Sequence, residues 1–132
     1  MAGWGTGSFE NDDAAAWVAE LSAVKPDDVT QILLQAADHP GYLEVHDASV
    51  AVAAAEVVAV LGGSPAPGVP TSIVEWARKN PQASTAELRA LAVRALERIR
   101  RNSEVKDLWM EADGLNDWTA AIQELQSRLS NQ

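Results

Sequence analysis

Cysteine is missing from this 132-residue chain, and phenylalanine and tyrosine occur once each. The missing cysteine excludes disulfide bonds, thiolate nucleophiles and cysteine-containing zinc sites. The N-terminus lacks the basic and apolar regions of a secretory signal. The longest apolar run, residues 48–61, is interrupted by Ser49 and Glu56 and is too short to cross a bilayer. We therefore expect a soluble, cytoplasmic protein with no membrane partner.

Basic residues are nearly absent from the first part of the chain. Residues 1–77 contain eleven acids and a single base, Lys25, whereas residues 78–132 contain nine bases and eight acids. An acidic half of this kind repels phosphate backbones, so we expect no nucleic-acid partner and favour a basic protein or a cation. The alternative is a solvated acidic surface that only keeps the protein in solution. Nothing in the sequence indicates an oligomeric state.

Period-two alternation is also missing, and apolar residues recur at helical spacing along the whole chain. We predict an all-α fold, with residues 1–132 forming a single-domain bundle of about six to seven helices. Trp17, Trp76 and Trp118 fall in apolar stripes and are expected in the core. Together with capping and breaking signals, the spacing predicts helices over residues 11–22, 26–38, 47–62, 70–79, 84–101, 104–112 and 115–130.

The segment 47–62 is rich in alanine and valine and is apolar on every side. Such a helix is normally surrounded by others, so we expect it at the centre of the bundle, with Asp47 as its N-cap. Glu56 lies in the middle of this segment. A buried carboxylate is costly unless a backbone turn, an indole N–H, an arginine or a metal satisfies it. We favour hydrogen bonds from a docked N-terminal segment or from a tryptophan, with a functional carboxylate in a pocket as the alternative.

The N-terminal segment, residues 1–9, combines three glycines with two large aromatic residues, Trp4 and Phe9. Burial of these rings would offset the entropy lost on ordering the glycines, so we predict an ordered lead-in docked on the bundle. Asn11 and Asp12 fit the cap and the first turn of a helix without any ligand.

Both histidines of the chain lie near carboxylates in residues 38–47. Glu44, His46 and Asp47 form the candidate ligand cluster of this segment. The histidines lack metal-site spacing, and Pro40-Gly41 separates the two halves, so we expect neither a metal nor another cofactor.

The segment Trp4-Gly-Thr-Gly-Ser-Phe-Glu-Asn-Asp-Asp-Ala14, followed by Trp17 and Leu21, resembles the opening of a bacterial family catalogued as domain of unknown function 4259. The stretch Ala53-Ala-Ala-Glu-Val-Val-Ala59 and the ending from Leu108 to Leu129 are similar to that family too. The resemblance implies a small helical bacterial protein of unassigned role and supplies no catalytic residues. Its signature positions here are Trp4, Gly5, Gly7, Phe9, Asn11, Asp12 and Glu56.

Three functions remain open from the sequence, of which the third is a purely structural or oligomeric role that a large exposed apolar patch would favour. The first is a non-enzymatic binding or regulatory module, of the immunity type for example, with a basic protein as its partner; the charge asymmetry favours it. The second is a metal- or small-ligand-dependent hydrolase that uses Glu56, Glu44 and a histidine. A serine or cysteine nucleophile paired with a histidine base at recognisable spacing is missing, so we predict no catalytic residues.

Overall fold

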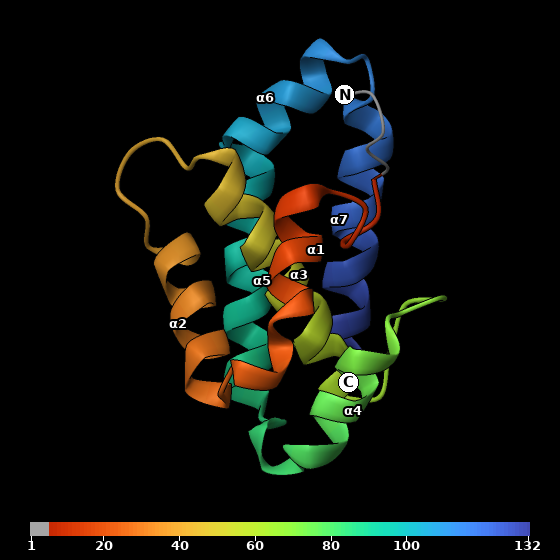
Figure 1. The fold of residues 1–132 in the computed structure, drawn as a ribbon. Helices are drawn as coiled ribbons and strands as arrows, with labels where there is room; N and C mark the ends of the chain where they lie inside the picture. The colour runs from red at the N-terminus through yellow and green to blue at the C-terminus, as the bar shows by residue number, and fades with distance from the viewer. Residues whose placement is uncertain (1–5) are drawn as a thin grey trace.

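All regular structure in the described part of this protein is helical. A computed structural model describes residues 6–132, and within that range it contains seven α-helices and two short 3₁₀ segments but no strand (Figure 1). The predicted all-α architecture is confirmed over these residues. The elements are α1 (Asp12–Ala19), η1 (Leu21–Ala23), α2 (Pro26–Ala37), α3 (Val45–Leu61), α4 (Thr71–Lys79), η2 (Pro81–Ala83), α5 (Ala86–Arg101), α6 (Glu104–Glu111) and α7 (Leu115–Ser130).

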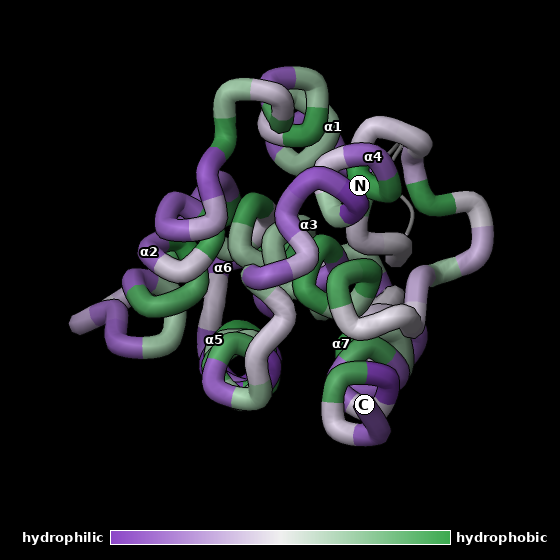
Figure 2. Tube along the Cα trace, turned by 90° about the horizontal axis from the view of Figure 1, so that it is seen from below, coloured by the Kyte–Doolittle hydropathy of each residue, from purple (hydrophilic) through white to green (hydrophobic). Residues whose placement is uncertain are grey.

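The helix α3 lies between the others. Figure 2 shows it near the middle, with α1, α2, α5 and α7 around it, and it packs against each of the other six α-helices of the described chain. Residues 48–59 of α3 are buried without interruption. Its alanines allow neighbouring backbones to approach closely. Over residues 6–132, no helix has the length and apolar character needed to span a membrane.

Local signals place several helix ends where the sequence predicts them. Asn11 caps α1 by accepting a hydrogen bond from the Ala14 amide at 2.9 Å. Pro26 is the first residue of α2, a position where its missing N–H leaves no helical hydrogen bond unmade. Gly114 separates α6 from α7 and is the N-cap of α7. Each of these helix ends is therefore determined by a residue at or next to that end.

The start of α3 differs from the prediction. The helix begins at Val45, so Asp47 lies in its first turn and is not the N-cap. Glu44 occupies the cap position, but its side chain makes no capping bond. Instead, the Glu104 carboxylate accepts the Val45 amide at 2.7 Å, from 59 residues away. This tertiary contact replaces a local cap. The prediction of Asp47 as the N-cap was wrong because it considered only residues next to the helix start.

Two other predicted helices are longer than the observed ones by more than one residue. The predicted helix 11–22 ends as an α-helix at Ala19, and the chain continues through the 3₁₀ turn η1. The predicted helix 84–101 begins at Ala86, because Thr85 is the residue whose side chain accepts the Leu88 amide, at 3.1 Å. Both differences concern the first or last turn, where helices commonly fray or tighten.

Candidate functional site

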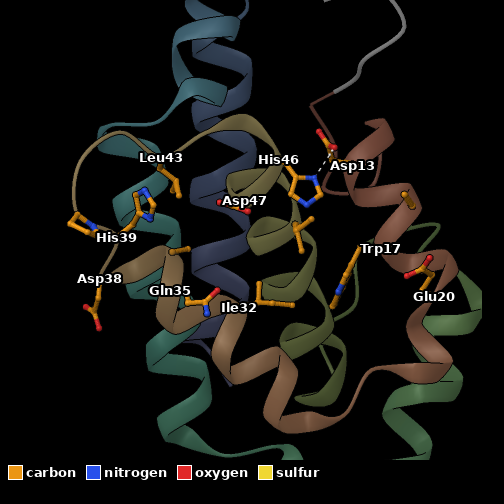
Figure 3. Close-up of a pocket in the computed structure, with 14 residues that line it drawn as sticks. Asp13, Trp17, Glu20, Ile32, Gln35, Asp38, His39, Leu43, His46 and Asp47 are labelled. Carbon is orange, nitrogen blue, oxygen red and sulfur yellow. Dashed lines mark hydrogen bonds and ion pairs between the residues drawn. The ribbon is translucent and has the colours of Figure 1, made fainter.

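A cavity of about 730 Å³ lies between α1, α2 and α3 (Figure 3). Its volume falls in the range typical of ligand-binding pockets. The walls come from α1 and α2, and the first half of α3 contributes the base. Trp17, Ile32 and Val50 supply apolar surface from these three helices. The polar lining residues are Asp13, Glu20, Gln35, Asp38, His39, His46 and Asp47.

Trp17 is half-buried on the wall of this cavity, which corrects the prediction that it lies in the core. Trp76 and Trp118 are in the core as predicted, with 6% and 3% of their surface exposed. α1 is only eight residues long, and the cavity lies between it and α2, so Trp17 borders the cavity on that side. In Figure 3 the side chain of Trp17 points toward the space between α1 and α2.

The loop between α2 and α3 closes one end of the cavity and is held on α5. Arg98 donates a hydrogen bond to the Gly41 carbonyl at 2.6 Å. Arg94 forms an ion pair with Asp38, also at 2.6 Å. Bases from the second half of the chain therefore fix an acidic segment of the first half.

Tyr42 lies in this loop and is the only tyrosine of the chain, so its titration can be measured separately. Its hydroxyl donates a hydrogen bond to Asp107 Oδ2 at 2.6 Å. This bond is the main cause that raises the pKa of Tyr42 from 10.0 to about 12. Because the folded-state pKa is raised, the bond supports the fold fully below pH 10 and is lost as pH rises through about 12.

We expect the Asp107→Ala variant to lower the pKa of Tyr42 toward 10, because it removes the hydrogen-bond acceptor. Ultraviolet absorbance of the tyrosinate measures this titration without overlap from a second tyrosine. Glu111→Ala is the matched control, since Glu111 acts on Tyr42 only through its charge and more weakly. An unchanged midpoint in Asp107→Ala would contradict the hydrogen bond.

A histidine–carboxylate pair at the rim of the cavity joins the α1 wall to the base that α3 forms. His46 Nδ1 of α3 and Asp13 Oδ1 of α1 lie 2.9 Å apart (Figure 3). The hydrogen bond with Asp13 raises the pKa of His46 above its usual 6.5. The His46 side chain is 68% exposed, so solvent screens the pair and it adds little to stability. Within the cavity, a protonated His46 offsets the negative charge of Asp13.

The cavity carries a negative charge. Four carboxylates line it, and no lysine or arginine is among the lining residues. Two of the four, at positions 13 and 38, are paired as described above. Glu20 and Asp47 are exposed and have no ion-pair partner among residues 6–132. These two carboxylates are therefore left to interact with a cation from outside.

The predicted ligand cluster is brought together only in part. His46 and Asp47 line the cavity, whereas Glu44 does not. His39 also lines it, and its Nε2 lies 3.1 Å from the Tyr42 carbonyl. Within residues 6–132, no group of three or more histidines and carboxylates is arranged to hold a metal ion. The site is an apolar pocket with an acidic rim.

Glu56 lies apart from this cavity, in a buried ion pair. Only 1% of its surface is exposed. Arg128 of α7 binds both carboxylate oxygens, at 2.5 Å and 3.0 Å, and Ser8 of the lead-in donates to Oε2 at 2.9 Å. The pair with Glu56 raises the pKa of Arg128 further above its usual value. Both oxygens of the carboxylate therefore already accept hydrogen bonds from Arg128, and Oε2 also accepts one from Ser8.

Of the signature residues that the structure describes, Gly7 and Asn11 line a small cavity. Trp4 and Gly5 lie outside the described residues. Phe9 is half-buried and packs against the core, and Asp12 is exposed in the first turn of α1. Gly7 is half-buried beside this small cavity of about 20 Å³ between the lead-in and α3, α6 and α7. None of the described signature residues lines the larger cavity.

Sequence reasoning missed most of the cavity. The sequence did not predict Ile32, Glu20 or Gln35 as site residues, although all three line the cavity. One signal did point to this region, because every lining residue lies between positions 13 and 50, inside the half with a single base. The charge imbalance along the sequence indicated an acidic region that includes these residues. The cavity itself results from the packing of α1 and α2 on α3.

A family model described as a domain of unknown function (DUF4259) matches residues 3–121 of the chain. No curated protein and no solved structure matches the chain. The matched range runs from the lead-in into α7 and includes the cavity and Glu56.

Proposed function

The chain belongs to the DUF4259 family, whose description assigns no activity, and we propose that this protein is a non-enzymatic binding module for a basic protein. The α1–α2–α3 cavity is its binding site. A role of this kind suits an immunity-type or regulatory protein, which acts by occupying its partner. The hydrolase alternative is not proposed, because both oxygens of Glu56 are engaged by Arg128 and Ser8.

One observation carries the proposal. The concave surface has an apolar interior, an acidic rim and no basic residue other than histidine. Charge complementarity across an interface speeds encounter and selects partners by the sign of their charge. Apolar surface inside the rim can then supply binding free energy when it is covered. A basic partner satisfies both requirements.

The proposal is tested with a short lysine- and arginine-rich peptide that contains no apolar residue. We expect amide chemical-shift changes to cluster on α1, α2 and the first half of α3. They should weaken as salt rises from about 50 to about 300 mM, because screening shortens the reach of exposed charges. Changes spread over all acidic residues, or insensitive to salt, would contradict a specific site.

Two charge-neutralised variants separate the cavity from the general acidity of the surface. Glu20→Gln/Asp47→Asn removes two exposed carboxylates at the rim. Asp27→Asn/Asp117→Asn removes the same charge from exposed first-turn positions of α2 and α7, outside the cavity. We expect the first double variant to weaken peptide binding much more than the second. Equal weakening would show that only net charge matters.

A further inference from the structure

The cavity has the form of a groove between two antiparallel helices. In Figure 1, α1 descends and α2 ascends again after the turn through η1, and both pack on α3. α2 has 12 residues, so its axis is about 18 Å long, which equals about three helical turns. Side chains of α1 form one wall and side chains of α2 the other, with Val50 of α3 between them.

The apolar surface lies along the inside of this groove. Trp17 of α1 and Ile32 of α2 are both half-buried and line the groove from opposite walls. A tryptophan with one open face is a frequent anchor in interfaces, since it offers a large area and a partner for cations. A helix recognised in a groove inserts apolar residues at i, i+3, i+4 and i+7 in this way.

The exposed carboxylates lie on the rim at two separate points. Glu20 follows the last residue of α1, and Asp47 lies in the first turn of α3. The other two carboxylates of the lining are already paired with His46 and Arg94. A bound helix with lysine or arginine beside its apolar stripe would meet unpaired acids on the rim, whereas an acidic helix would be repelled.

Building on the proposed function, we propose that the occupant is a basic amphipathic helix of the partner protein, about three turns long. Its apolar stripe lies between α1 and α2 against Trp17 and Ile32, and its basic flanks face Glu20 and Asp47. The bound helix lies between α1 and α2 and covers the part of α3 that lines the groove. This defines the partner more narrowly than positive charge does, because the spacing of its apolar residues is part of the recognition.

Two synthetic peptides of equal composition test the helical pattern. Both contain leucine and lysine; in one the leucines recur at i, i+3, i+4 and i+7, and in the other their order is scrambled. We expect the amphipathic peptide to bind at least about tenfold more tightly by calorimetry, a difference of about 1.4 kcal/mol. It should also gain helical circular dichroism on binding, and the scrambled peptide should not.

A pair of glutamine variants on α2 locates the peptide. Gln35 is exposed and lines the groove, whereas Gln31 is exposed one turn away and does not. Gln35→Arg puts a cation and added bulk into the groove, so we expect it to weaken the amphipathic peptide by about tenfold or more. Gln31→Arg makes the same change of charge outside the groove and should change the affinity less than about threefold. Neither substitution removes a buried contact, so loss of folding does not confuse the comparison.

The outcomes separate the two levels of the proposal. Equal affinities of the two leucine peptides, with binding still lost in Glu20→Gln/Asp47→Asn, would overturn the helical occupant and keep the basic partner. Equal effects of Gln35→Arg and Gln31→Arg would overturn the groove as the place of docking. If neither the lysine- and arginine-rich peptide nor the amphipathic one perturbs α1–α3, the proposed function fails as well.

Discussion

Replacing Arg128 with methionine is expected to lower the free energy of unfolding by about 3 kcal/mol or more, measured by urea denaturation at neutral pH. The substitution keeps a long apolar stem but removes both hydrogen bonds to Glu56. The carboxylate would remain in a helix whose surroundings are apolar, with Ser8 as its one remaining side-chain donor among residues 6–132. Loss of one partner of a buried pair is costly because the other charge stays desolvated.

The double variant Glu56→Met/Arg128→Met tests this reason. It removes both charges and fills the space with apolar side chains, so we expect it to be more stable than Arg128→Met alone. The reverse order would mean that the arginine acts through packing and not through its charge. Glu124→Gln is the matched control, since Glu124 binds the same guanidinium at 2.6 Å but its side chain is 59% exposed. Its effect should stay below about 1 kcal/mol.

The helices were largely predictable because their signals are local. Asn11, Pro26 and Gly114 act on the backbone within one turn of their own positions, and the sequence alone assigns them. The start of α3 was predicted wrongly because its first amide is capped by Glu104, a residue that no local pattern connects to it. The same limit applies to Glu56, whose burial the apolar context predicted but whose partner Arg128 is 72 residues away.

The candidate site was less predictable than the fold. A cavity is a property of how helices are spaced, and the amphipathic stripe containing Trp17 looks the same whether a helix covers it or not. The acidic character of the region was readable from composition. Glu20 and Asp47 stay unpaired in the described chain, while the acids at positions 13 and 38 are paired. This difference depends on how α1 packs on α3 and how α2 packs on α5.

Deleting residues 1–9 is the second change from which we expect a large effect. It removes Phe9, which is half-buried against the core, and Ser8, which donates to the buried Glu56 at 2.9 Å. Partial burial of a phenylalanine contributes about 1–2 kcal/mol, and a hydrogen bond to a charged group about 1.5–3 kcal/mol. Asn11 remains, so α1 keeps its N-cap. The deletion also removes the entropy cost of ordering these residues, which offsets part of the loss. We therefore expect the melting temperature to fall by roughly 5–10 °C in a calorimetric scan.

The single variants Ser8→Ala and Phe9→Ala divide this effect between its two causes. Ser8→Ala leaves Arg128 on Glu56 and should lower the melting temperature less than the deletion does. If the deletion leaves the melting curve unchanged, the lead-in does not stabilise the bundle, and its glycines and aromatic residues would be free for binding. Because the lead-in and the α1–α2 groove share no described residue, the deletion should also leave peptide binding at the groove unchanged. Lost binding at a temperature where the shortened protein is folded would show that the two surfaces act together.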